Sequence, residues 1–128
     1  MTSFPTDALV CEEALKAAED YVLGVATQDR ERLTTLFAET AHIVGVDEGK
    51  AISIPRDRWI NAMCAPERAG QGSRKYQVVA VHLAGDVGVI IVHTSNGRFD
   101  YCDVLALLKY DGTTRITQKS FHQCERQA

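Results

Sequence analysis

At 128 residues the chain has the size of one ordinary domain, so we expect residues 1–128 to form a single domain. Its 14 basic and 17 acidic residues give a net charge of −3 without a basic run, which argues against nucleic acid as a partner. No apolar stretch approaches the roughly 20 residues that span a bilayer, and the first residues are too polar for a signal peptide. We therefore predict a soluble, cytoplasmic protein with no membrane partner.

The N-terminal part of the chain predicts two helices. A long amphipathic helix is expected from Pro5 to about Thr27, because apolar residues recur there at helical spacing and Pro5 suits a first turn. Asp29 can cap a second helix. The side chains expected to face inward from that second helix are Leu33, Leu36 and Phe37.

The next segment predicts a hairpin followed by a third helix. Residues 41–54 alternate loosely around the turn Asp47-Glu48-Gly49, which is typical of two short antiparallel strands. Pro55 then begins a helix with Trp59 on its apolar side.

From Arg74 onward the hydrophobic period changes to two, and three turn signals divide the chain into four strands. Helices first and strands second indicate an α+β fold. We expect a few helices to close a strongly curved antiparallel sheet around an interior pocket. The three turns are Ala84-Gly85-Asp86, Asn96-Gly97 and Asp111-Gly112.

A two-residue turn at Asp111-Gly112 would set the register of the last two strands, and any bulge would reverse the faces beyond it. One face is then apolar at one end and polar at the other, and Ile90 joins it from the preceding strand. The opposite face is also apolar, so we expect a second copy of the chain to cover it in a homodimer. The inward-facing pairs are Leu107 with Ile116, Leu105 with Gln118, Asp103 with Ser120, and Tyr101 with His122.

This element order resembles the nuclear transport factor 2-like superfamily. The stretches YVLGVATQDRERLTTLFAETAHIVGVDEG, RDRWINAM and FDYCDVLALLKYDGTTRITQKSFH look like its Putative lumazine-binding and SnoaL-like branches. The resemblance implies the cystatin-like cone, a curved antiparallel sheet wrapped around the long N-terminal helix, with two further helices closing a cone-shaped pocket at the open end. It also implies frequent dimerisation through the outer sheet face. One departure is Thr113-Thr114-Arg115, which stands where a Trp would be expected.

Three residues are candidates for chemistry. Asp103, on the inner face, is the proposed acid or base; the alternative is a structural carboxylate satisfied by a hydroxyl such as that of Ser120. His122, expected beside Tyr101, would form an acid/base or ligand-orienting pair, or would be an idle exposed histidine. Tyr21 would donate its hydroxyl to a ligand oxygen, or would simply pack in the core.

Other residues are expected to bind a ligand without taking part in chemistry. The four histidines and four cysteines fall on separate elements without close pairs, so we predict no metal site. No nucleotide-binding glycine pattern occurs, and no cofactor is expected. The predicted ligand-binding residues are Tyr101, Trp59, Phe37, Ser120, Gln118 and Ile90.

The predicted function is binding of a small, mostly apolar molecule with one or two oxygens in the interior pocket. If the protein is an enzyme, which the sequence leaves open, proton transfer or dehydration is the expected reaction. The alternative is a non-catalytic dimeric binding or protein-association module. The superfamily includes isomerases, dehydratases, cyclases and transport factors, so the fold does not choose between these functions.

Overall fold

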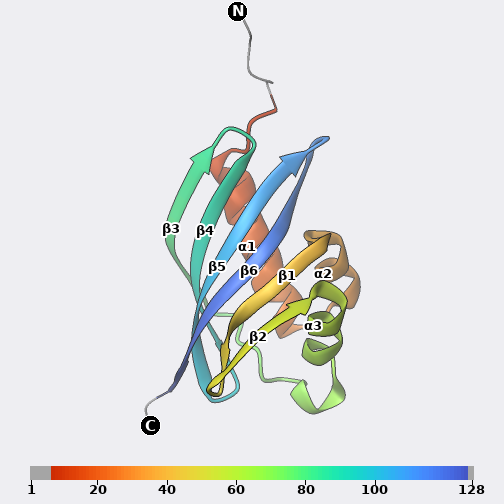
Figure 1. The fold of residues 1–128 in the computed structure, drawn as a ribbon, viewed down its shortest axis with the longest axis vertical. Helices are drawn as coiled ribbons and strands as arrows, with labels where there is room; N and C mark the ends of the chain where they lie inside the picture. Colours follow the sequence, from red (N-terminus) through yellow and green to blue (C-terminus); the bar gives the residue numbers. More distant parts are fainter. Residues whose placement is uncertain (1–6, 127–128) are drawn as a thin grey trace, which may run out of the picture.

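The computed structural model describes residues 7–126, which contain three α-helices and six strands in the expected order (Figure 1). A short 3₁₀ turn, η1, covers Pro66–Arg68. Residues 7–10 are not helical and α1 begins at Cys11, so the predicted start of this helix at Pro5 is wrong. Pro5 itself lies outside the described residues. The elements are α1 (Cys11–Ala26), α2 (Arg30–Leu36), β1 (Phe37–Asp47), β2 (Lys50–Pro55), α3 (Arg56–Met63), β3 (Gln77–Ala84), β4 (Val87–Asn96), β5 (Phe99–Tyr110) and β6 (Thr113–Glu125).

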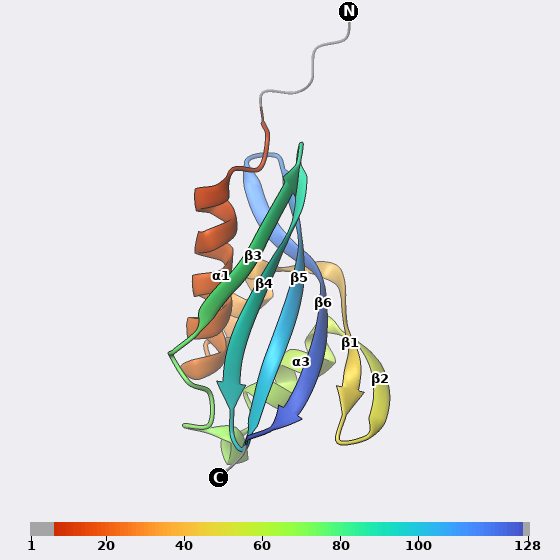
Figure 2. The same cartoon turned by 90° about the vertical axis from the view of Figure 1, so that its left-hand side faces the viewer.

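The strands form one curved sheet in the order β2-β1-β6-β5-β4-β3. All neighbouring strands are antiparallel except β1 and β6, which run parallel. This parallel pair joins the predicted hairpin to the predicted four-stranded meander, and the hairpin bends away from the other strands (Figure 2). The α+β fold with a curved, unclosed sheet confirms the predicted fold class.

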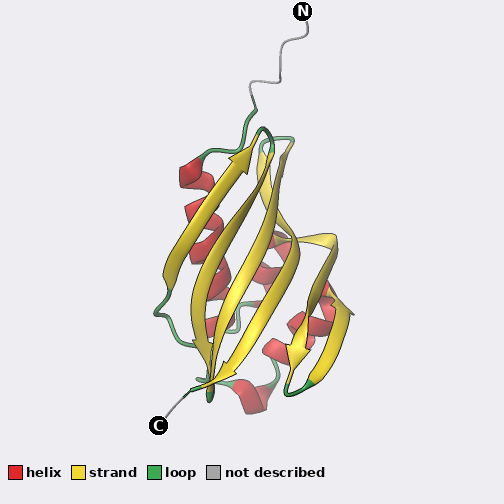
Figure 3. Ribbon diagram, turned by 60° about the vertical axis from the view of Figure 1, so that its left-hand side comes forward, coloured by secondary structure: helices red, strands yellow, loops and turns green. Residues whose placement is uncertain are grey.

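The helices lie together on one side of the sheet (Figure 3). Helix α1 packs against β3, β4 and β6, whereas α2 and α3 pack under the β1–β2 hairpin. The second helix begins as predicted, because the Asp29 carboxylate accepts a hydrogen bond from the Arg32 backbone N–H at 3.1 Å. The helical layer therefore covers the inner face of the sheet and leaves its outer face uncovered by the described residues.

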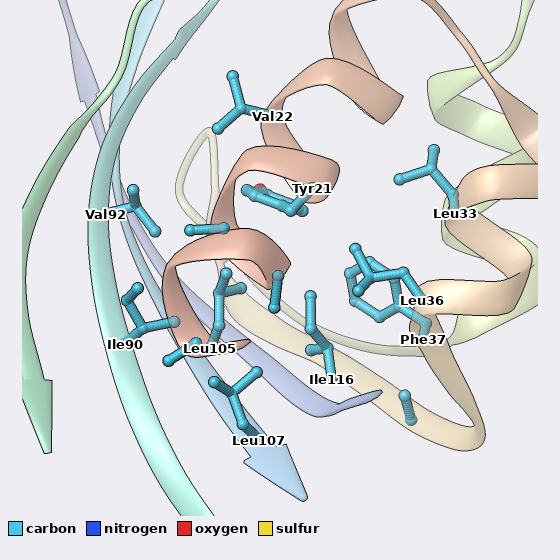
Figure 4. Packing of buried hydrophobic residues seen from close by; sticks show 14 of the residues in the cluster. Tyr21, Val22, Leu33, Leu36, Phe37, Ile90, Val92, Leu105, Leu107 and Ile116 are labelled. Carbon is cyan, nitrogen blue, oxygen red and sulfur yellow. The ribbon is translucent and has the colours of Figure 1, made fainter. Parts of the chain in front are cut away.

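The core lies between α1 and the central strands (Figure 4). Its side chains are at most a few per cent exposed and come from alternate positions of β4, β5 and β6, as a sheet with one face on helices requires. Figure 4 shows these side chains gathered beside α1. The central members are Ile90, Leu105, Leu107 and Ile116.

A bulge interrupts the pairing of β5 with β6. Leu107 lies opposite Ile116 as predicted, but the next pair is Ala106 with Gln118, so Thr117 is an extra residue without a partner on β5. The Thr117 hydroxyl donates a hydrogen bond to the Ala106 carbonyl at 3.3 Å. Side chains alternate between the two faces of a sheet. Every β6 residue after the extra one therefore points to the face opposite to the one predicted.

Beyond the bulge the predicted register is wrong by one residue. Each β5 residue points to the side of the sheet that was predicted. Its partner on β6, however, is one residue later in the sequence than predicted. Gln118, Ser120 and His122 therefore lie on the outer face and not in the interior. The observed inward pairs are Leu105 with Lys119, Asp103 with Phe121, and Tyr101 with Gln123.

Candidate functional site

A cleft of about 590 Å³ lies at the polar end of the inner face. It is bounded by the C-terminal half of α1, by α3, by the β1–β2 hairpin and by the ends of β4, β5 and β6. Its volume falls within the range of roughly 300–1,000 Å³ that is typical of small-molecule sites. The deepest polar group in its wall is the carboxylate of Asp103, which is only 1% exposed.

The Asp103 carboxylate is oriented by two hydroxyl groups. Its Oδ2 atom accepts hydrogen bonds from the Tyr21 hydroxyl at 2.8 Å and from the Thr94 hydroxyl at 2.7 Å. Its Oδ1 atom is buried and has no hydrogen-bond donor among the described residues. A buried carboxylate oxygen without a donor is unusual in proteins, so this atom is the first candidate to meet a ligand.

Tyr21 reaches Asp103 from the face of α1 that packs on the sheet. Burial raises the pKa of the Tyr21 phenol well above its usual value of 10.0, and the nearby negative charge of Asp103 acts in the same direction. The phenol therefore keeps its proton throughout the physiological pH range. Its hydroxyl is occupied by Asp103, so Tyr21 positions the carboxylate in this structure.

Lys119 is the main residue that the predicted register misplaces, because a register that puts Gln118 and Ser120 inside puts Lys119 on the outer face. The bulge at Thr117 turns it inward, where it is 7% exposed and lines the cleft. Its ammonium lies over three aromatic rings, at 4.5 Å from the ring centroid of Trp59, 5.1 Å from that of Tyr21 and 5.6 Å from that of Phe121.

Burial lowers the pKa of Lys119 below its usual value of 10.5. The charge of Asp103 opposes this shift, and the charge of Arg68 adds to it. The two cations are thus close enough to repel one another across the cleft. Arg68 comes from the 3₁₀ turn η1, and its Nε atom is buried without an acceptor among the described residues.

The aromatic wall around Lys119 is fixed from both sides. Trp59 stacks on Tyr21 with ring centroids 6.2 Å apart, and Phe37 packs behind it at 5.0 Å. On the other side the Phe121 ring lies against Gly45 of β1, where a Cβ atom would come within 2.7 Å of the ring. Any larger residue at position 45 would therefore displace Phe121.

The rim of the cleft is polar and internally hydrogen-bonded. The Gln123 amide donates to Asp47 at 2.8 Å and to the Tyr101 hydroxyl at 3.0 Å, and its oxygen accepts from the Glu48 backbone N–H. Arg98 forms an ion pair with the Glu48 carboxylate. These contacts tie the β1–β2 turn to the ends of β5 and β6.

The structure brings together four of the nine predicted site residues. Asp103, Tyr21, Tyr101 and Trp59 all line the cleft. Two others, Phe37 and Ile90, are fully buried in the core, and Phe37 supports the cleft from behind by packing against Trp59 and Tyr21. The remaining three, which the bulge turns outward, are Ser120, Gln118 and His122.

His122 does not approach Asp103. It lies on the exposed side of β6, level with Cys102 and with His93 on the neighbouring strands, beside a separate shallow hollow. Its predicted pairing with Tyr101 is wrong for the same reason as the rest of the β6 register. The predicted acid/base pair of Asp103 and His122 is therefore not formed in this structure.

One feature of the sequence could have indicated that Phe121 and Lys119 point inward. Ile116 and Phe121 are the two large apolar residues of the last strand, and they are five positions apart, so a regular strand would place them on opposite faces. A bulge between them places both inside. The same shift carries Lys119 inward, whereas nothing local indicated that Arg68 or Thr94 would reach the cleft.

The described residues contain neither a candidate metal-binding cluster nor a candidate membrane-spanning helix. Their His, Cys, Asp and Glu side chains form no group of three or more that could hold a metal ion. None of their helices combines the length and the apolar character needed to cross a membrane.

The fold is that of the nuclear transport factor 2-like class, and solved structures of that class match the chain over most of its length. A protein of unknown function from Silicibacter pomeroyi DSS-3 superposes with a TM-score of 0.81 at 23% identity, covering 88% of this chain and 94% of the other. One from Shewanella baltica OS155 gives 0.78 at 19% identity, covering 90% and 94%. One from Methylobacillus flagellatus KT gives 0.68 at 19% identity, covering 94% and 99%.

Residues 10–122 match the family described as "Putative lumazine-binding", so the chain belongs to that family. This confirms the predicted superfamily and its lumazine-binding branch. No curated protein matches the chain.

Proposed function

We propose that the cleft binds a small planar organic molecule and that the Oδ1 atom of Asp103 accepts a hydrogen bond from an N–H or O–H group of that molecule. The observation that carries the proposal is the buried Oδ1 atom without a donor, in the wall of a cleft large enough for such a ligand. A ligand donor would satisfy this oxygen.

The shape of the walls supports a flat ligand. Trp59, Tyr101 and Phe121 present aromatic surface to the cleft, which favours stacking or edge contacts with another ring system. The family description names lumazine, a flat pteridinedione that carries both N–H and C=O groups. Such a molecule has the hydrogen-bond donor that Asp103 lacks.

The same carboxylate is the catalytic base in the reaction that we propose for this site, a proton transfer or a dehydration. The hydroxyls of Tyr21 and Thr94 hold Oδ2, so Oδ1 is the oxygen free to take a proton from a bound molecule. Tyr21 orients the base and stabilises its charge. His122 has no part in this mechanism.

The test is the Asp103→Asn variant, which keeps the shape of the side chain and removes its charge. Lumazine and related planar N–H compounds would be titrated by calorimetry. The single indole N–H signal of Trp59 in NMR spectra would report binding in the cleft. We expect saturable binding to the wild type and an affinity about 10-fold to 100-fold lower for the variant, because hydrogen bonds to charged groups contribute about 1.5–3 kcal/mol.

The matched control is Asp57→Asn, because the Asp57 side chain is 75% exposed and lies outside the cleft. It should bind like the wild type. Equal affinity of Asp103→Asn and wild type would remove Asp103 from the site, and absence of saturable binding by any planar compound would refute the proposal. For any reaction found, Asp103→Asn should abolish turnover.

A second proposal concerns the outer face of the sheet, for which we infer that two copies of the chain associate there as a homodimer. The motivation is that the helices cover only the inner face, while apolar side chains such as those of Val89, Ile91 and Val104 are half-buried on the other. If the cleft binds nothing, a non-catalytic association module built on this face is the function that the structure supports next.

Native mass spectrometry at micromolar concentration tests the dimer. The wild type should be dimeric, and Val104→Glu, which places a charge in the middle of the outer face, should be monomeric with unchanged secondary structure. A monomeric wild type would rule out this association.

A further inference from the structure

We propose that the ligand of the cleft is an anion, an aromatic carboxylate or an acidic enol, and that its negatively charged group lies against the ammonium of Lys119. This inference rests on the proposed binding function of the cleft and specifies the charge of the ligand. It differs from the expectation of a mostly apolar molecule.

The first reason is that Lys119 is buried without an acceptor. Its Nζ atom lies over three aromatic rings, and no described residue forms a hydrogen bond or an ion pair with it. Ring faces attract a cation, but they do not supply the lone pairs that an ammonium needs as hydrogen-bond acceptors. An anionic oxygen in the cleft would supply them.

The second reason is that Arg68 is a second cation in the cleft with a donor that lacks an acceptor in the described part of the chain. Arg68 lines the cleft, and its Nε atom is buried without an acceptor among the described residues. Within this part of the chain its side chain forms one hydrogen bond, a long one of 3.5 Å from Nη2 to the Asn96 side chain. Repulsion from Arg68 lowers the pKa of Lys119, which places the two cations within electrostatic reach. An anion between them would relieve that repulsion.

The third reason is that the acidic groups near the cleft already have partners. Asp47 accepts a hydrogen bond from Gln123, Glu48 is paired with Arg98, and Asp103 Oδ2 holds two hydroxyl hydrogen bonds. Among the described residues lining the cleft, the charged side-chain atoms without a hydrogen-bond partner therefore include Lys119 Nζ, Arg68 Nε and Asp103 Oδ1. A ligand that carries an anionic group beside an N–H or O–H donor satisfies all three.

Two probes that differ only in charge test the proposal: 2-naphthoate, which is anionic at pH 7, and the neutral 2-naphthamide. We expect the wild-type protein to bind naphthoate at least about tenfold more tightly than naphthamide, as measured by calorimetry. Lys119→Met should abolish this preference and keep binding of the amide. Lys16→Met is the matched control, because the Lys16 side chain is 63% exposed on α1, and it should keep the preference.

Arg68→Gln provides an independent variant at the rim, where substitution leaves the core intact, and it should reduce the preference several-fold even if Lys119→Met does not fold. Equal binding of both probes to the wild type, or a preference that survives both substitutions, would refute the proposal that the ligand is an anion. Neither result would contradict the proposed binding function. Failure of both probes to bind in the cleft would count against the binding function itself, and this inference would fall with it.

Discussion

The two ends of the inner sheet face are built from the same strands but differ in what they enclose. At one end Leu107, Ile116 and Ile90 pack tightly under α1 and are 2% exposed or less. At the other end Asp103 and Lys119 line a cleft of about 590 Å³. The boundary between them on β6 is the bulge at Thr117, where the strand changes which residues it sends inside. One extra residue therefore separates the structural core from the cleft.

The largest loss of stability is expected when a side chain is truncated at the tightly packed end of the inner face. Leu107→Ala removes fully buried methyl groups and leaves a cavity, so it should lower the free energy of unfolding by about 2–5 kcal/mol. Ile52→Ala, at the open end, should cost less than half as much, because Ile52 already borders the cleft and little new cavity forms. Urea denaturation of both variants measures the difference. Equal costs would mean that the cleft is closed and packed in solution.

A smaller effect is expected for the hydrogen bond that links α1 to the polar end. Tyr21→Phe leaves Asp103 Oδ2 with Thr94 as its remaining donor, which should destabilise the protein by about 1–3 kcal/mol. Tyr110→Phe is the control, since Tyr110 is 73% exposed and its hydroxyl should contribute almost nothing. A variant Tyr21→Phe as stable as the control would show that the buried carboxylate does not depend on this donor.

Chemical modification of lysines examines the inward position of Lys119 directly. A bulky amine-reactive ester should modify Lys119 about tenfold more slowly than Lys16, because only transient opening exposes the buried amine. Mass spectrometry of peptides from the modified protein gives both rates. Similar rates would place Lys119 on the outer face, as a β6 strand without the bulge would do.

The smallest effect should appear at alkaline pH. The pKa of Tyr21 is raised in the folded state above 10.0, so above that pH the unfolded chain loses the phenol proton while the folded chain keeps it. This group's contribution is thus fully present below pH 10 and declines as the pH rises through the folded-state pKa. The stability gap between wild type and Tyr21→Phe should therefore narrow above pH 10 in urea titrations. A stability difference that stays constant above pH 10 would show that folding does not raise the pKa of the Tyr21 phenol.

Much of the fold could be predicted because it depends on local patterns. Asp29 caps the second helix through its own side chain, and the Asp111-Gly112 turn has positive φ angles at both residues, as a tight two-residue hairpin requires. Asp103 and Tyr21 were identified because the side of a strand or helix follows from spacing alone. These features need no knowledge of distant parts of the chain.

The sequence by itself determined the order of the elements, the α+β class and the presence of Asp103 on the inner face of the sheet, since these follow from the period of the apolar residues. Only the tertiary structure decided which residues of β6 accompany Asp103. The parallel contact with β1 and the bulge at Thr117 set the position of β6, and they turn Lys119 inward and His122 outward. Because strand side chains alternate strictly, a shift of one residue exchanges the interior and the surface.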